Sequence, residues 1–218
     1  SKLAWLELNK ALQGNLLRYG DTGFDLLAQP NNLVYKKNLP VAVAVCRNSM
    51  DVSVCLKWCS SNGVHPTIRG GGHSYAGFSS TTGLLIDIQG LNEITFNPDR
   101  ETVTVGGGVK NIDIFNNLGK VNRSITHGRC FGVGVGGFLL GGGVGFDMRQ
   151  HGLGCDRLQQ TQLVLASGDL IQANKQVNPD LFWACQGGGG GNFGVNTSFE
   201  LNVFPASNHV MFKLNWES

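Results

Sequence analysis

Glycine is the residue that most restricts how this chain can fold. The 218 residues include 32 glycines, about twice the roughly 7% that proteins use on average. They gather in four clusters, at 70–72, 106–108, 132–145 and 187–194. Because segments with the patterns of strands and helices flank every cluster, we interpret the clusters as ordered loops rather than as a disordered linker. Such loops indicate that the backbone lies very close to another group.

Composition and charge exclude several classes of protein. Seventeen basic and fifteen acidic residues give a net charge of +2, which is too balanced to suggest nucleic acid or a membrane surface as a partner. No apolar run reaches the roughly 20 residues that a membrane-spanning helix needs, and the first residues lack the pattern of a signal peptide. We therefore expect a soluble protein and leave its localisation open, secretion included. The six cysteines form no zinc-type CxxC pair, so we predict no metal site.

The hydrophobic pattern predicts an α+β fold of two lobes that divide near residue 90. Before that point we expect a short amphipathic helix over 3–12, a buried strand over 41–46 and a helix that begins at the N-cap Ser49 and stops at Gly63. A strand then runs into the first glycine cluster. Within the longer helix, Cys55 and Cys59 fall on the apolar face, so we predict that both belong to the core.

The second half of the chain is predicted to be richer in strands. The segment 94–108 reads as a hairpin, 109–118 as an amphipathic helix, and 158–174 as two strands joined by a Ser-Gly-Asp turn. A helix follows with Asn178 as its cap and Pro179 at its first position. In the last strand, the apolar side chains and one threonine alternate along a single face at Val195, Thr197, Phe199, Leu201 and Val203.

One motif imitates a dinucleotide-binding fingerprint. Gly132, Gly134 and Gly137 form G-x-G-x-x-G, and the acidic Asp156 follows about 20 residues later. The Rossmann fold needs a hydrophobic strand before this motif and a helix after it. Here "THGRC" precedes it and the glycine-rich "FLLGGGVGF" follows, so we predict neither a Rossmann unit nor, without GxxxxGK[ST], a P-loop. Backbone N–H groups in glycine loops can still hold a pyrophosphate.

Five motifs in order resemble one known family. "RGGGHSYAG", "HGRCFGVGVGGFLLGGGVGF", "HGLGCDRL", "VLASGD" and "LFWACQGGGGGNFGV" resemble the berberine bridge enzyme-like flavoproteins of the vanillyl-alcohol oxidase/p-cresol methylhydroxylase (PCMH) superfamily. The likeness runs from about residue 30 to residue 204. It implies a PCMH-type FAD-binding domain in which the cofactor is extended between two α+β lobes. The division it implies is a helical extension over 1–29, lobe 1 over 30–90, lobe 2 over 91–204, and over 205–218 the start of a missing substrate domain.

The resemblance also implies which residues contact FAD. The first cluster would wrap the pyrophosphate, and His73 would carry the flavin through its 8α-methyl carbon. The alternative is that this histidine caps a turn. Metal binding is disfavoured because no second ligand lies at a suitable spacing. The implied pyrophosphate loop consists of Arg69, Gly70, Gly71, Gly72, His73 and Ser74.

Cys130 matches the cysteine that bonds to flavin C6 in part of the family, so a bicovalent FAD is the sharper hypothesis. Arg129 and His127 are expected to lower the pKa of its thiol. The alternative is a small buried residue beside a glycine loop. The sequence departs from the family where Phe131 and Gly132 replace the usual proline and threonine, and also where Phe138 replaces a histidine.

Further contacts are implied in the third and fourth clusters. Val133 would lie near flavin C4a, where a small side chain leaves room for oxygen and favours an oxidase. For the four residues of the fourth cluster, the alternative is an ordinary turn residue. The remaining implied FAD contacts are Gly136, Gly137, Gly142, Gly143, Gly191, Asn192, Phe193 and Gly194.

The resemblance implies an oxidase that removes a hydride from a carbohydrate or alcohol C–OH group to flavin N5 and reduces molecular oxygen to hydrogen peroxide. Its partners would be a small-molecule substrate and oxygen, with no nucleic acid and no membrane. A dehydrogenase with another electron acceptor, or a truncated or degenerate module without turnover, remains an alternative. The general base is not identified, because the resemblance places it in the missing substrate domain. His127, His151 and Tyr75 read as packing residues.

Overall fold

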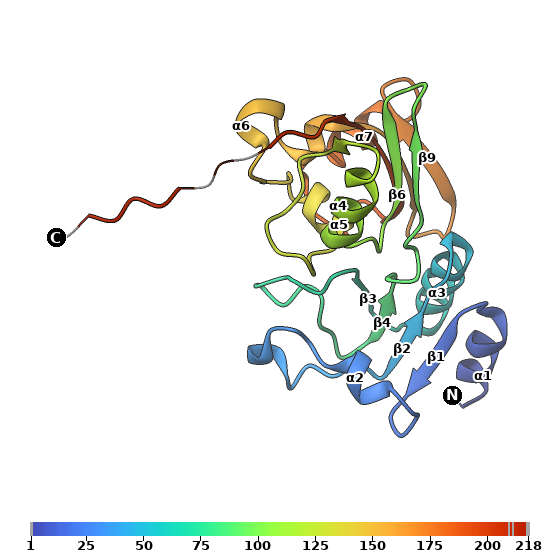
Figure 1. The fold of residues 1–218 in the computed structure, drawn as a ribbon. Coiled ribbons are helices and arrows are strands. Elements are labelled where there is room, and N and C mark those ends of the chain that lie inside the picture. The colour runs from blue at the N-terminus through green and yellow to red at the C-terminus, as the bar shows by residue number, and fades with distance from the viewer. Residues whose placement is uncertain (1, 209, 211, 217–218) are drawn as a thin grey trace.

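The chain folds into two lobes, each built on one β-sheet (Figure 1). The computed structural model describes residues 2–208, 210 and 212–216. The change from the first sheet to the second falls between Asp87 and Ile94. Of the segment 205–218, the positions 209, 211, 217 and 218 lie outside the described residues. Lobe 1 comprises α1 (Lys2–Ala11), β1 (Asn15–Arg18), α2 (Phe24–Ala28), the 3-10 helix η1 (Leu33–Tyr35), β2 (Ala42–Val45), α3 (Ser49–Asn62), β3 (Pro66–Arg69) and β4 (Leu84–Asp87).

The sheet of lobe 1 has the strand order β1-β2-β4-β3. Strands β2, β4 and β3 run parallel, and β1 pairs antiparallel with β2 at one edge. Both faces are covered: Leu8 and Cys55 of α1 and α3 pack on one side with Ala44, and Phe24 of α2 packs on the other with Val43. Burial on both faces explains why β2 is apolar throughout, and β4 up to its last residue, rather than alternating.

The N-terminal segment is fastened to this sheet by one buried carboxylate. Asp51, which is 1% exposed, accepts hydrogen bonds from the backbone N–H groups of Gln13, Gly14 and Arg47 at 2.8–3.0 Å. The segment expected as a helical extension over 1–29 thus also contains an edge strand, β1, that belongs to the sheet of lobe 1.

Lobe 2 is an antiparallel sheet covered by helices on one face. Its order is β5-β6-β10-β8-β9, with β10 in the centre. Ile114, Leu139 and Phe182 from three helices pack on Val105 and Phe199 of the sheet. The elements are β5 (Ile94–Asn97), β6 (Thr102–Gly106), α4 (Asn111–Gly119), β7 (Arg123–Ser124), α5 (Val135–Leu140), α6 (Met148–His151), the 3-10 helix η2 (Gly154–Arg157), β8 (Leu158–Val164), β9 (Leu170–Asn174), α7 (Pro179–Ala184), β10 (Val195–Asn202) and β11 (Phe204–Pro205).

Most of the predicted elements are confirmed. The hairpin in 94–108 is the antiparallel pair β5 and β6, and the Ser-Gly-Asp turn joins β8 to β9. Gly63 ends α3 in the left-handed conformation with φ 63°. Cys55 and Cys59 are buried in the core of lobe 1. All five residues predicted to share one face of the last strand are buried.

Two local predictions were wrong. The N-cap of α3 is Asn48, whose side chain accepts a hydrogen bond from the N–H of Asp51, and Ser49 is already helical. Asn178 is the N-cap residue of α7 and Pro179 its first residue, as predicted, but the Asn178 side chain makes no capping hydrogen bond and its amide donates to the carbonyl of Gln172. The glycine-rich stretch after Gly134 does form a short helix, α5, because its apolar face packs into the core of lobe 2.

Candidate functional site

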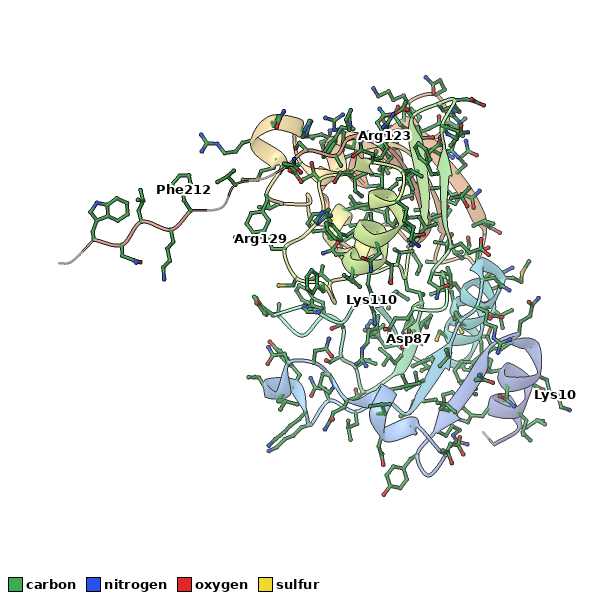
Figure 2. The ribbon with its side chains drawn as sticks, in the orientation of Figure 1. Lys10, Asp87, Lys110, Arg123, Arg129 and Phe212 are labelled. Carbon is green, nitrogen blue, oxygen red and sulfur yellow. The ribbon has the colours of Figure 1, made fainter. Side chains whose placement is uncertain are left out.

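A polar cleft of about 210 Å³ opens between the two lobes. It lies where the parallel strands β3 and β4 end, the place where open α/β sheets bind ligands. Figure 2 shows Asp87 and Lys110 at the junction of the lobes. The lining residues come from the start of the chain (Leu26, Leu27, Gln29, Asn31), from beyond β3 (Arg69, Gly71, His73), from the end of β4 (Asp87, Gln89) and from lobe 2 (Lys110, Gly132).

The first and third glycine clusters meet back to back at this cleft. A Cβ added at Gly71 would overlap the backbone nitrogen of Gly134 and lie 2.7 Å from the carbonyl oxygen of Gly132. A Cβ at Gly134 would in turn overlap the nitrogen of Gly71. Glycine is therefore required at both positions so that the two loops can touch.

Arg69 joins the glycine loop to its surroundings. It is 7% exposed, and its guanidinium donates to the carbonyl oxygens of Ser79, Leu27 and Gln29 at 2.5–3.3 Å. Its Nη2 atom is buried and finds no hydrogen-bond partner among the residues that the structure describes. Burial lowers the pKa of Arg69, while the charge of Asp87 opposes this shift. The side chain was predicted as part of a loop of backbone donors; the structure shows that it also braces that loop.

Asp87 is the negative charge of the cleft. Its parallel-strand partner is Arg69, and it accepts hydrogen bonds from the backbone and side chain of Gln89 at 2.8 and 3.0 Å. Burial raises the pKa of Asp87; the bonds from Gln89 and the charges of Arg69 and Lys110 act in the opposite direction. The cleft therefore contains two cationic side chains and one acid, which favours an anionic group as its ligand.

His73 is exposed at the mouth of the cleft and faces the third glycine cluster. A Cβ added at Gly132 would lie 3.1 Å from its Nε2. The loop that carries His73 is braced from the N-terminal side, because the Asn31 amide donates to the carbonyl of Gly71 at 2.9 Å and Tyr35 Oη donates to the carbonyl of Tyr75 at 3.3 Å. Tyr75 itself is 91% exposed, so its prediction as a packing residue was wrong.

Cys130 presents an exposed thiol, whereas the other five cysteines are buried. This overturns its alternative reading as a buried residue. Burial and Cys55 raise the pKa of the Cys59 thiol to about 12, which makes that thiol unreactive. The side chains predicted to activate Cys130 make contacts elsewhere: Arg129 lies 5.7 Å from the ring centre of Phe146, and His127 Nδ1 lies 3.0 Å from the carbonyl of its neighbour Gly128. Activation by these two residues stays a prediction.

Other predicted residues lie near the cleft without lining it. Ser74 Oγ accepts the N–H of Phe78 at 3.1 Å and closes a turn. Val133 is half-buried. In α5, a Cβ at Gly136 would come 2.9 Å from the carbonyl oxygen of Gly107, while Gly137 is exposed.

The residues predicted around 142–143 and 191–194 are not brought to this cleft. The N–H of Gly189 donates to the carbonyl of Leu140, at the far end of α5. A Cβ at Gly143 would press on Gly154, and the Asn192 amide donates to the carbonyl of Gly188. The structure thus joins the first cluster to the start of the third, and places the fourth beside the end of α5.

Sequence reasoning missed several cleft residues, among them Asp87, Gln89, Lys110 and Asn31. One signal was available for Asp87. It ends the otherwise apolar strand "LLID", as Arg69 ends "PTIR", and opposite charges at the ends of adjacent buried strands indicate a shared polar site. Asn31 carries no comparable pattern in the sequence.

The residues at the cleft fit an FAD pyrophosphate. The backbone approaches closely at the glycine loops, and Lys110 and Arg69 place two positive charges at the cleft, although the unpartnered Nη2 of Arg69 is itself buried. Because ligand sites are typically about 300–1,000 Å³, this cleft would enclose only part of a dinucleotide. In the part of the chain that the structure describes, no group of three or more His, Cys, Asp or Glu side chains could hold a metal ion, and no described helix has the length and apolarity to cross a bilayer.

Comparison with known proteins agrees with this geometry. The family described as an FAD binding domain matches residues 40–174. The uncharacterized FAD-linked oxidoreductase YgaK of Bacillus subtilis (strain 168) is 35% identical over 210 residues, which cover 94% of this chain and 46% of that protein.

Solved structures show the same likeness. The wild-type BBE-like 1 protein of Physcomitrella patens superposes with a TM-score of 0.88 at 30% identity, over 93% of this chain and 44% of that one. A glucooligosaccharide oxidase of Acremonium strictum, described by its 6-S-cysteinyl, 8α-N1-histidyl FAD, superposes with a TM-score of 0.83 at 33% identity, over 91% and 42% of the two chains. This chain spans less than half the length of these relatives. It belongs to the FAD binding domain family and, within it, to the berberine bridge enzyme-like proteins with a PCMH-type FAD-binding fold.

Proposed function

We propose that the protein is an FAD-dependent oxidase that oxidises a C–OH group of a carbohydrate or alcohol. The observation that carries this proposal is the meeting of the His73 loop and the Cys130 turn at one glycine-lined cleft between the lobes. The names of similar proteins support it, since one is an FAD-linked oxidoreductase and another a glucooligosaccharide oxidase. A small-molecule substrate and molecular oxygen are the proposed partners.

The residues of the chain would bind and orient the cofactor. Lys110 and Arg69 would offset the charge of the pyrophosphate, and the backbone at Gly71 and Gly132 would approach it closely. When bound, the flavin would accept a hydride from the substrate at N5 and pass the electrons to oxygen, which leaves as hydrogen peroxide. The protein would position the cofactor and supply charge, and its glycine loops would keep side chains away from the cofactor.

We also propose that FAD is bonded to both His73 and Cys130. Both side chains are exposed, so each is free to reach a ligand, and the loops that carry them touch at Gly71 and Gly134. The doubly linked FAD of the similar glucooligosaccharide oxidase supports this assignment. A thiol and an imidazole are the two nucleophiles that such links require.

The test is to purify the intact protein with its cofactor, precipitate it with acid and measure the mass and absorbance of the pellet. We expect the flavin to stay with the protein, and peptide mapping to find it on His73 and Cys130. The His73→Ala and Cys130→Ala variants should each lose one link and keep the other. His65→Ala, at an exposed histidine outside the cleft, is the matched control and should keep both.

Turnover is tested separately with oligosaccharides and simple alcohols as substrates. Hydrogen peroxide formed in step with oxygen consumption supports the oxidase. Reduction of an artificial acceptor without oxygen consumption would show a dehydrogenase, and bound FAD without any turnover would show a binding module. Release of all FAD on precipitation contradicts the covalent assignment and leaves the binding site standing.

A further inference from the structure

The turn that carries Cys130 is held by the beginning of α4. The backbone N–H of Asn111 donates to the carbonyl oxygen of Val133 at 3.0 Å, and the N–H of Ile112 donates to that of Phe131 at 3.2 Å. A helix leaves its first N–H groups without partners inside the helix. The turn supplies those partners here, so the position of the turn is tied to the start of α4.

Asn111 adds a third hydrogen bond to the turn from a buried side chain. The residue is 1% exposed, and its Nδ2 donates to the carbonyl oxygen of Cys130 at 3.0 Å. The N–H of Val133 donates to the same oxygen at 3.3 Å. The Oδ1 atom of Asn111 is buried and has no hydrogen-bond partner among the described residues. Because an unpartnered buried acceptor destabilises the fold, an apolar residue would be favoured here if the amide had no further role.

The space around this amide is closed on one side by Gly128. A Cβ added at Gly128 would collide with Nδ2 of Asn111 and lie 3.3 Å from the ring of Phe138. The absence of a side chain at position 128 therefore leaves the amide its place against the carbonyl of Cys130. Asn111, which lies outside the five motifs, and Gly128, which lies in one of them without an assigned role, thus set the geometry of the turn together.

The opposite side of the same turn touches the loop of His73. Gly134 lies against Gly71, and Gly132 lies against the imidazole. The separation between His73 and Cys130 is therefore fixed from two sides, by the glycine contact on one and by α4 on the other. The His73 loop has its own brace, the hydrogen bond from Asn31 to Gly71.

We propose that Asn111 is a positioning residue for the bond between Cys130 and FAD. Its amide holds the carbonyl of Cys130 so that the thiol reaches a flavin already anchored at His73. In forming the bond, the Cys130 S–H and the flavin C6–H are replaced by one C–S bond, and the two hydrogen atoms leave on molecular oxygen as hydrogen peroxide. This inference rests on the double link proposed above. Since His73 is braced independently, loss of the amide should affect the Cys130 bond alone.

The test uses Asn111→Asp in the intact protein purified with its cofactor. The substitution keeps the size of the side chain and replaces the donor by a carboxylate that only accepts hydrogen bonds. We expect the flavin to remain on His73, with the link to Cys130 and its contribution to the visible spectrum lost. Amide hydrogen exchange over 130–135 should become about fivefold faster, as expected for the loss of one buried hydrogen bond. Asn117→Asp, on the exposed face of the same helix, is the matched control.

Gly128→Ala provides a second route to the same effect. Its methyl group should push the side-chain amide of Asn111 away from the carbonyl of Cys130, although residue 111 is still asparagine. The proposal is overturned if both variants keep the Cys130 link and wild-type exchange, or if both links fall together. If wild-type protein carries no flavin on Cys130, the double link fails as a proposed function. Exchange alone then decides whether Asn111 holds the turn of Cys130: faster exchange at 130–135 in both variants supports this hold, and unchanged exchange overturns it.

Discussion

Gly71 of the first glycine cluster and Gly191 of the fourth look alike in the sequence, but glycine is needed at the two positions for different physical reasons. At Gly71 the Cβ is excluded by the backbone of Gly134, which belongs to a loop far away in the sequence. At Gly191 a Cβ would meet no atom of the described structure within 4 Å, and the constraint is a backbone φ of +78°. The first glycine permits two loops to touch, whereas the second permits a turn.

This difference agrees with the places of the two glycines, because Gly71 lines the cleft and Gly191 does not. Contact between loops requires a partner at a fixed place, so the first cluster is locked to the start of the third beside His73. The turn at Gly191 requires only its own backbone conformation, and the loop 187–194 lies beside the end of α5 with much of its surface exposed. A count of glycines does not separate these two uses.

Replacing Gly71 by alanine should give the largest effect. The new methyl group has to separate two backbones that cannot rotate away, so we expect a loss of about 3 kcal/mol in the free energy of unfolding and loss of bound FAD. Chemical denaturation and cofactor content measure the two effects. Gly137→Ala is the control, because its Cβ has open space among the described residues and a helical backbone; it should stabilise by about 0.5 kcal/mol. Equal stability of the two variants would contradict the contact between loops.

Replacing Gly191 by alanine should have an intermediate effect. Only the left-handed backbone is strained, which costs about 1 kcal/mol, and no neighbour has to move. We therefore expect a lower melting temperature with FAD content unchanged. Gly191→Asn is the matched variant and should cost less, since asparagine tolerates this conformation. Loss of FAD in Gly191→Ala would show that the fourth cluster reaches the cofactor and would remove the distinction between the two regions.

Replacing Asp87, the acid of the cleft, by asparagine should have the smallest effect on stability. Burial raises the pKa of Asp87 above the ordinary value of 3.8, so the folded state binds this proton more tightly than the unfolded state does. Its contribution to stability is complete below that value and declines as the pH rises through the folded pKa. Asp87→Asn should remove this decline, so the stability of the variant relative to wild type should increase with pH across that window. Chemical denaturation over a pH series measures this change in relative stability. Asp99→Asn, at an exposed turn residue, is the control. Parallel curves of stability against pH for Asp87→Asn and wild type would contradict the raised pKa of Asp87.

The sequence predicted the elements well where the signal is local. The stop at Gly63, the β5–β6 hairpin and the alternating face of β10 depend on neighbouring residues, and the structure confirms them. The N-cap of α3 was misplaced by one residue because Asn48 and Ser49 are both good caps, and the choice depends on which side chain reaches the N–H of Asp51. Helix α5 was missed because packing into lobe 2 outweighs the weak helical propensity of glycine.

The candidate site was predicted only where a motif carried it. The loops of His73 and Cys130 were found through family resemblance, but their contact through Gly71 and Gly134 follows from tertiary structure. Asp87 acquires its place beside Arg69 only when β3 and β4 pair in parallel. Residues whose roles arise from pairing between distant segments leave no periodic pattern for sequence reasoning to detect.

The carboxylate of Asp51 has a consequence for where this domain can be cut. The family match begins at residue 40, yet two of the three backbone donors to Asp51 lie at Gln13 and Gly14. A fragment that starts at the family boundary would keep the glycine clusters but would lose the side of the cleft that Leu26, Leu27, Gln29 and Asn31 form. It would also leave a buried charge without most of its donors and the hydrogen-bonding edge of β2 uncovered, so it would be expected to self-associate through that edge.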